Sequence, residues 1–254
     1  MKSLYEFPDI YDLILRHPPE VVSMEVDSIV RLLAQRQLAG GRVLELACGT
    51  CAHGIELAQR GYHVWGLDLS PQMLEGAQKR ARVAGVELDL LQGDITDFSL
   101  DAEIFDCVIF MSETFPLITE YDDLKSHFAV VRRHLKHGGL YVIDIDSHEH
   151  GVGTSYEVWG RKTVPVENGK VEIWHESFPG DWVRGTSHMI MHTRMHIGDE
   201  VYETADDWHI RVDSPWNLSV MVDVLEDWSL VGFYSWRDLS KDIVDEKHYF
   251  MVLE

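Results

Sequence analysis

Three acidic side chains in the first half of the chain stand where a ligand site can form. Glu45 lies inside an apolar run, Asp68 ends a second run, "HVWGLD", and Asp94 follows a third, "VELDLLQG". The first run leads into a turn that contains Gly49, and Asp68 comes about 20 residues later. A glycine lets the backbone approach a ligand closely because it has no Cβ atom. A carboxylate at the end of the next strand can accept hydrogen bonds from both hydroxyls of a ribose. This spacing predicts a site for a nucleotide-containing ligand.

The apolar runs around these residues alternate with helical patterns. Residues 20–35 carry apolar side chains at helical spacing, and Ser70-Pro71 is a favourable helix start. The predicted strands in this part of the chain are Val43–Cys48 and residues 63–70, 86–94, 105–112 and 140–146. The predicted helices are residues 20–35, 55–60, 71–84 and 124–135, the last of them stopped by Gly138-Gly139. Strands that alternate with helices predict a parallel sheet covered on both faces, and right-handed crossovers make it doubly wound and Rossmann-like.

The pattern changes after residue 147. Asn168-Gly169 lies between two apolar runs, which predicts a β-hairpin, and residues 188–197 alternate between methionine or isoleucine and basic side chains. Ser214-Pro215 then begins a further helix, and two apolar runs follow it. We therefore expect an α/β fold, a Rossmann-like doubly wound seven-stranded sheet with an inserted small antiparallel β-sheet. The expected division is 1–39 for an N-terminal arm and helix, 40–147 for a cofactor-binding α/β core, 148–213 for the inserted antiparallel β subdomain, and 214–254 for the C-terminal completion of the core.

Four motifs, taken in order, resemble those of one family. They are "LELACGT", "GLDLSPQML", "QGDI" and "HLKHGGLYVIDI". Through them the chain resembles the class I S-adenosylmethionine-dependent methyltransferases of the small-molecule type. The resemblance implies S-adenosylmethionine as the cofactor and methyl transfer as the activity. Because this cofactor has no phosphate to seat against the first turn, we expect Ala47 and Cys51 to be tolerated where the family often has glycine.

The resemblance also assigns cofactor contacts. Asp68 would accept hydrogen bonds from the ribose, and Asp94 would accept one from the adenine amino group. Leu69 and Ile95 would sandwich the adenine ring, and Glu45 would lie near the methionine end. The residues assigned to cofactor binding are Glu45, Ala47, Cys48, Gly49, Asp68, Leu69, Met73, Asp94, Ile95 and Met111. The residue types alone leave plainer interpretations open: the two aspartates as turn residues, Met73 as core, and Glu45 as an acid hydrogen-bonded to the turn.

Four side chains are candidates for contact with the reacting groups. His148 and His150 follow the fifth predicted strand, where α/β proteins bind ligands, and an imidazole can act as a general base. Glu113 could orient a cationic amine, and Tyr11 could fold over the cofactor. The alternatives are solvated loop histidines, an acid at a helix start, and an aromatic anchor for the N-terminal arm.

Composition and charge limit the class of methyl acceptor and the cellular compartment that we expect. The net charge of −21 repels phosphate backbones and anionic lipid, and "FMSETF" lacks the Asn/Asp-Pro-Pro-Tyr pattern of nucleobase amine methylation. We therefore expect a small-molecule methyl acceptor with a nitrogen or oxygen nucleophile, and neither a nucleic acid nor a membrane partner. The cysteines number three, too few for a disulfide framework, and no secretory signal is recognised, so we expect a cytoplasmic protein. The oligomeric state stays open.

Several alternatives remain at this point. Neither Cys48-x-x-Cys51 nor "DIDSHEH" belongs to a fuller ligand pattern, so no metal is expected. A nucleotide-dependent oxidoreductase would share the strand, turn and acid but needs Gly-x-Gly-x-x-Gly spacing. A non-catalytic protein that binds S-adenosylmethionine or serves as an interaction scaffold is the other alternative. Residues 151–213, rich in Trp, His and Met, are expected to close over the site as a lid, with a subunit interface as the alternative.

Overall fold

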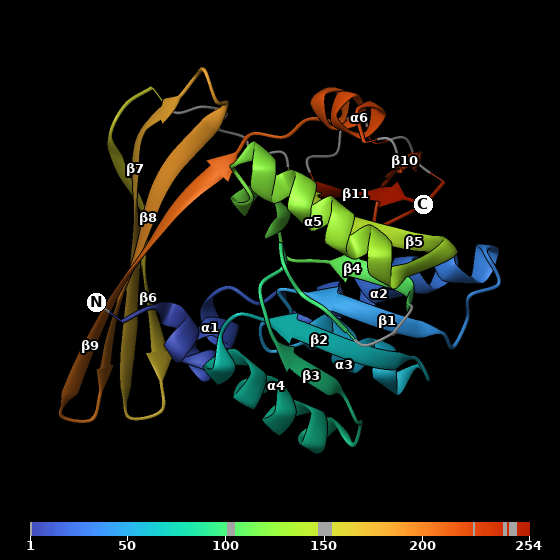
Figure 1. The fold of residues 1–254 in the computed structure, drawn as a ribbon. Coiled ribbons are helices and arrows are strands. Elements are labelled where there is room, and N and C mark those ends of the chain that lie inside the picture. The colour runs from blue at the N-terminus through green and yellow to red at the C-terminus, as the bar shows by residue number, and fades with distance from the viewer. Residues whose placement is uncertain (1, 101–104, 147–153, 226, 241–242, 244–247) are drawn as a thin grey trace.

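The computed structural model describes residues 2–100, 105–146, 154–225, 227–240, 243 and 248–254. It contains a seven-stranded sheet and a separate four-stranded antiparallel sheet (Figure 1). The larger sheet has the strand order β10-β11-β5-β4-β1-β2-β3. Its strands are β1 (Arg42–Leu46), β2 (His63–Asp68), β3 (Asp89–Gln92), β4 (Phe105–Phe110), β5 (Leu135–Asp146), β10 (Leu230–Tyr234) and β11 (His248–Leu253). The strands from β5 to β3 run parallel, and β11 and β10 are antiparallel additions at one edge.

Alternate side chains of these strands form two cores, one on each face of the sheet. Helices α2 (Pro19–Gln35) and α3 (Ala52–Gln59) cover the face that includes Val43 and Val142. Helices α5 (Tyr121–His134) and α6 (Pro215–Asp223) cover the opposite face, where Leu44 and Tyr141 are buried. Helix α4 (Pro71–Ala84) packs beside α3. Both faces of the strands are buried because the connections are helices, as the alternating pattern predicts.

The smaller sheet has the order β6-β7-β8-β9, formed by Glu157–Val166, Gly169–Asp181, Thr186–Ile197 and Glu200–Arg211. The predicted hairpin is present, but its turn is Glu167-Asn168, and Gly169 already pairs with Val166. A Cβ atom on Gly169 would lie 1.7 Å from the carbonyl oxygen of His196, so this strand position accepts only glycine.

The N-terminal arm is helical and lies between the two sheets (Figure 1). It consists of a 3₁₀ turn, η1 (Leu4–Glu6), and a short helix, α1 (Pro8–Ile14), where the sequence predicted only an arm. Leu4 is fully buried against Val171 and Met191 of the smaller sheet. The Asp206 carboxylate on β9 accepts hydrogen bonds from the backbone N–H of Leu4 and the Ser3 hydroxyl. The inserted sheet therefore holds the arm in place.

Several predicted boundaries move by a few residues. Strand β1 ends at Leu46 because Ala47 already has a left-handed backbone, with φ +46°. Helix α5 ends at His134 rather than before Gly138-Gly139, because Leu135 is extended and pairs with Phe105 of β4. Within the described residues, no helix combines the length and the apolar character that crossing a bilayer requires.

Candidate active site

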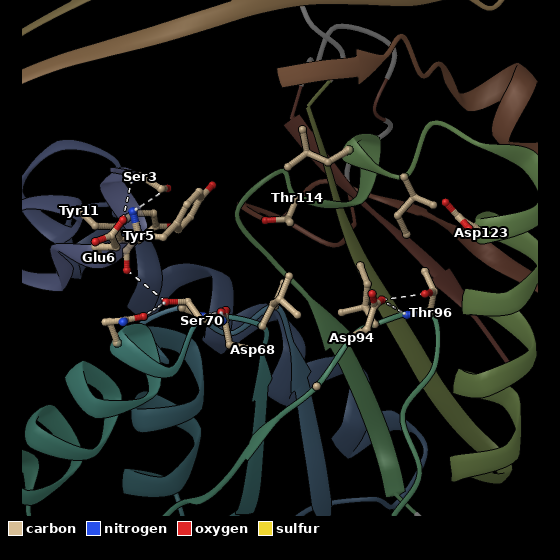
Figure 2. Close-up of a pocket in the computed structure, with 18 of the residues that line it drawn as sticks. Ser3, Tyr5, Glu6, Tyr11, Asp68, Ser70, Asp94, Thr96, Thr114 and Asp123 are labelled. Atoms are coloured by element: carbon tan, nitrogen blue, oxygen red, sulfur yellow. Dashed lines mark hydrogen bonds between the residues drawn. The ribbon is translucent and has the colours of Figure 1, made fainter. Parts of the chain in front are cut away.

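A cavity of about 580 Å³ opens at the carboxyl edge of the larger sheet (Figure 2). Its walls come from the N-terminal arm, from the turns after β1, β2 and β3, and from the segment after β4. The side chains that line it are Ser3, Tyr5, Glu6, Tyr11, Ala47, Gly49, Asp68, Leu69, Ser70, Gln72, Gly93, Asp94, Ile95, Thr96, Thr114, Leu117, Ile118, Thr119 and Asp123. Ligands of open α/β sheets bind at this edge, and the volume suits a drug-sized molecule.

Asp68 ends β2 and stands at the centre of the cavity wall. Its Oδ2 atom accepts a hydrogen bond from the backbone N–H of Gly49 at 2.7 Å, and Oδ1 accepts one from the backbone N–H of Ser70 at 2.8 Å. Burial raises the pKa of this carboxyl, while the backbone donors act in the opposite direction. A carboxylate has about four lone-pair positions, so each oxygen can accept a further hydrogen bond from a ligand.

Asp94 follows β3, the strand that pairs with β2, so the two aspartates lie at adjacent strand ends. Asp94 Oδ1 accepts hydrogen bonds from both the backbone N–H and the hydroxyl of Thr96. Leu69 and Ile95 line the same cavity, and the Leu69 side chain is 68% exposed although it is apolar. An apolar side chain exposed beside polar acceptors suits the face of a flat, partly apolar ligand.

The N-terminal arm contributes two tyrosines to the cavity. A Cβ atom on Gly49 would lie 3.8 Å from the Tyr11 ring, so this ring stands directly over the turn. Tyr5 packs against Tyr11 with the ring centroids 5.5 Å apart. Burial raises the pKa of both phenols, so each remains protonated near neutral pH.

The turn between β1 and α3 contains three residues with left-handed backbone. Ala47, Gly49 and Cys51 have φ values of +46°, +53° and +59°. Left-handed φ values favour glycine, so the turn makes the same backbone demand at all three positions, whether or not a phosphate is present. The expectation that Ala47 and Cys51 are tolerated because no phosphate binds stays a prediction, and the structure adds a backbone demand at both positions. The protein accepts left-handed strain at both positions.

Four residues assigned to the cofactor lie outside the cavity lining. Glu45 is buried, and its Oε2 accepts hydrogen bonds from the Gly54 backbone N–H at 2.8 Å and from the Cys51 thiol at 3.1 Å. The geometry thus matches the interpretation of Glu45 as an acid that is hydrogen-bonded to the turn. The other three, Cys48, Met73 and Met111, are buried side chains.

The candidates for contact with the reacting groups are placed as follows. His148 and His150 lie outside the described residues. Glu113 follows β4 with a left-handed backbone, and one carboxylate oxygen is 3.9 Å from His17 Nε2. It does not line the cavity, although its neighbour Thr114 does. Tyr11 is the only one of the four, among the described residues, that lines the cavity.

Sequence reasoning missed several lining residues. Tyr5, Ser70 and Thr114 are examples, and each comes from a segment whose side-chain direction depends on tertiary packing. The only signal in the sequence for these residues was the aromatic content of the N-terminal segment. Aromatic side chains that do not follow a helical or strand periodicity are expected to pack against another part of the protein.

Known proteins that are similar to this chain include methyltransferases. Residues 43–139 match the family described as "Methyltransferase domain". The putative methyltransferase YqeM of Bacillus subtilis is 30% identical over 174 residues, which are 68% of this chain and 66% of that protein. A dTDP-4-amino-2,3,4,6-tetradeoxy-D-glucose N,N-dimethyltransferase of Saccharopolyspora spinosa is 33% identical over 136 residues, 54% of this chain and 53% of that protein. The matched segments of these two relatives thus cover between half and two thirds of their lengths.

A solved structure shares the fold over nearly the whole chain. The S-adenosylmethionine-dependent methyltransferase from Clostridium acetobutylicum superposes with a TM-score of 0.78 at 21% identity, covering 98% of this chain and 97% of that one. The matched domain contains the turn after β1, Asp68 and Asp94, all of which contribute to the cavity lining. The chain belongs to the class I S-adenosylmethionine-dependent methyltransferases.

Proposed function

We propose that the protein transfers a methyl group from S-adenosylmethionine to an amine nitrogen of a small molecule. The observation that carries this proposal is the cavity in which Asp68 and Asp94 stand at adjacent strand ends beside Gly49. The amine is favoured because several relatives are N-methyltransferases by name, including two that act on dTDP-amino sugars and one on glycine or sarcosine.

The lining residues fit this cofactor. Asp68 would accept the ribose hydroxyls with the lone pairs that its backbone donors leave free. Asp94 would accept from the adenine amino group, and Ile95 and Leu69 would contact the ring. Tyr11 would cover the methionine end above Gly49. The cavity volume of about 580 Å³ has room for a ligand of this size.

Methyl transfer depends on the positioning of the reactants more than on covalent catalysis by the protein. S-adenosylmethionine supplies a methyl group that its sulfonium has already activated. The protein has to hold the acceptor nitrogen in line with that methyl group and exclude water. We assign the second task to the arm, because Tyr5 and Tyr11 line the cavity and are each partly buried.

The inserted sheet offers a place for the acceptor. A second cavity of about 430 Å³ lies between β9 and the segment after β4, lined by Leu117, Thr119, Asp207, Trp208 and His209. Leu117 and Thr119 also line the first cavity, so the two adjoin. We infer that the acceptor binds there. His209→Ala should then raise KM for the acceptor and leave cofactor affinity unchanged, whereas the reverse pattern would remove this cavity from the acceptor site.

Calorimetric titration of the purified protein tests the cofactor assignment. We expect S-adenosylmethionine and its demethylated product to bind and NADH not to bind. Asp94→Ala should lose about 1–3 kcal/mol of binding free energy, the cost of an unmade hydrogen bond to a charged group. Asp97→Ala is the matched control, an exposed aspartate in the same loop that does not line the cavity.

Two outcomes would contradict the proposal in different ways. NADH binding without S-adenosylmethionine binding would favour an oxidoreductase. Binding of the cofactor without release of its demethylated product, across a panel of amino sugars, amino acids and hydroxyl compounds, would favour a non-catalytic binding protein.

A further inference from the structure

Five titratable side chains gather at the carboxyl edge of the sheet, on the face that α2 covers. They do not line the cavity of Figure 2. They come from the turn after α1, from α2, α3, β5 and β11, so tertiary folding alone brings them together. They are His17, Glu25, His53, Asp144 and His248.

Glu25 stands at the centre of the cluster. His17 Nδ1 is 3.0 Å from its Oε1 atom, and His53 Nε2 is 2.8 Å from its Oε2 atom. His248 Nε2 lies 4.0 Å from Oε1 and makes a direct contact with Asp144 Oδ1. The ligand atoms of Glu25, Asp144 and His248 all lie within 4.8 Å of one another, and those of Glu25, His17 and His53 do so as well.

The carboxylates of this cluster are deeply buried. Glu25 and Asp144 have no exposed surface, and Asp144 Oδ2 has no hydrogen-bond partner among the residues that the structure describes. A buried carboxylate oxygen is costly to leave unpaired, and the His248 imidazole contacts the other oxygen of Asp144, Oδ1. Asp144 Oδ2 therefore marks a place where a cation would be stabilised.

We propose that Glu25, Asp144 and His248 bind a divalent transition-metal ion such as Zn²⁺. Carboxylate oxygens with an imidazole nitrogen form a ligand set typical of such ions, whereas Mg²⁺ and Ca²⁺ prefer oxygen alone. His17 offers a further nitrogen beside the same Glu25 oxygen. The ion would join α2 to β5 and β11, three elements that are distant in sequence.

His53 is a positioning residue in this arrangement. Its Nε2 atom holds the second oxygen of Glu25, and its Nδ1 atom is 3.7 Å from Glu45 Oε1. Glu45 in turn fastens the turn that bears Gly49. Partners of this kind orient a ligand and raise its affinity for metal without touching the ion. The cluster thus lies next to the cofactor turn but is separate from it.

The experiment measures metal content and affinity of the full chain. After removal of metal with a chelator, we expect the protein to take up one Zn²⁺ per chain, by elemental analysis and by calorimetry. Asp144→Asn and His248→Gln should each weaken uptake by more than about 100-fold, and His53→Gln by about 10–100-fold, as loss of an outer partner does. His188→Gln is the matched control, because His188, Asp207 and His209 form a more exposed cluster of the same residue types.

A second measurement needs no variant. In imidazole NMR spectra of the unmodified protein, Zn²⁺ should shift the resonances of His248 and His17 at one equivalent and leave His188 unchanged. The proposal is overturned if the unmodified protein takes up no Zn²⁺, Co²⁺ or Mn²⁺. It is also overturned if uptake survives Asp144→Asn and His248→Gln but is lost in His188→Gln. In either case protons on the imidazoles, rather than a metal, balance the buried carboxylates.

Discussion

At the scale of single residues, the turn after β1 combines tight hydrogen bonding with backbone strain. Asp68 accepts a hydrogen bond from the Gly49 backbone N–H in this turn, and Glu45 accepts one from the Gly54 backbone N–H at the start of α3. Those bonds hold Ala47 in a left-handed conformation that costs about 1–2 kcal/mol for a residue with a Cβ atom. The turn is therefore ordered at the expense of local stability, as functional turns often are.

Ala47→Gly should stabilise the protein. Glycine removes the left-handed strain but adds about 0.5–1 kcal/mol of backbone entropy loss on folding. The net gain in the free energy of unfolding should be about 0.5–1 kcal/mol, measured by urea denaturation. Ala129→Gly is the control, because Ala129 is exposed in the middle of α5, where the same change should cost about 1 kcal/mol. A loss of stability in both variants would show that Ala47 is unstrained.

His127 connects the cavity to the core. Its Nδ1–H donates to the Ile95 carbonyl oxygen at 2.9 Å, which leaves Nε2 to accept from the Tyr141 hydroxyl at 2.6 Å. Burial lowers the pKa of this imidazole to about 4, although the Ile95 hydrogen bond acts in the opposite direction. His127 is therefore neutral in the folded protein across most of the acidic range.

This pKa predicts acid sensitivity with a definite sign. Between pH 6.5 and about 4 the unfolded chain protonates His127 and the folded chain does not, so stability falls as pH decreases. The loss attributable to this residue should reach about 3 kcal/mol at pH 4. The measurement compares the free energy of unfolding of the unmodified protein and of His127→Asn from pH 8 to 4. As the pH falls, the unmodified protein should lose more stability than the variant. A pH-independent difference would contradict this assignment.

At the scale of elements, helix α4 joins the cavity to the arm. Ser70 caps the helix, its hydroxyl accepting a hydrogen bond from the Met73 backbone N–H at 3.3 Å. The same hydroxyl lies 3.2 Å from the Tyr5 carbonyl oxygen. The start of α4 therefore helps to set the position of an arm residue that lines the cavity.

Ser70→Ala should affect both stability and binding. Loss of the cap should cost about 1 kcal/mol of the free energy of unfolding, and loss of the Tyr5 contact should weaken S-adenosylmethionine binding several-fold. Ser214→Ala removes an equivalent cap from α6, away from the cavity, and should cost similar stability without changing affinity. Equal affinities in the two variants would show that the Ser70 contact does not position the arm.

At the scale of the whole molecule, the arm, the inserted sheet and the cavity form one assembly. The smaller sheet buries Leu4 and binds the arm through Asp206, and the arm then presents Tyr5 and Tyr11 to the cavity. The insertion thus contributes to the cofactor site through the arm. For this reason, replacing residues 151–213 by a linker would be expected to weaken cofactor binding as well as acceptor binding.

Asp206→Ala tests this coupling without touching the cavity. The variant removes the acceptor for the Leu4 N–H and the Ser3 hydroxyl, and cofactor affinity should fall by about 1.5–3 kcal/mol as the arm loosens. Glu203→Ala is the control on the same strand, where an exposed carboxylate pairs only with Arg194 in the described contacts. Calorimetry gives the affinities, and faster proteolysis of the arm in Asp206→Ala alone would confirm the cause.

The net charge of −21 supports a further prediction for the whole chain. Such a surface repels phosphate backbones, so affinity for DNA or RNA at physiological salt should be negligible. Salt-sensitive retention of either nucleic acid in a filter-binding experiment would be the contrary result.

The sequence by itself determined the parallel sheet, the placement of Asp68 and Asp94 at its carboxyl edge, and the antiparallel insertion. These depend on local periodicity and on turn residues such as Ser70-Pro71, which act within a few residues of the chain. It also indicated the family, because the ordered motifs around Gly49 keep their spacing.

Only the tertiary structure decided how distant segments meet. The arm's helices, its docking on Asp206 and the removal of Glu45 and Met73 from the cavity lining depend on packing between segments far apart in sequence. The cluster of Glu25, Asp144 and His248 is the extreme case, since its members come from α2, β5 and β11. Glu25 and His248 have ordinary local sequence contexts, and Asp144 opens the "DIDSHEH" stretch, which by itself shows no full ligand pattern. Only the fold brings their ligand atoms within reach of one another, where burial strengthens their interaction.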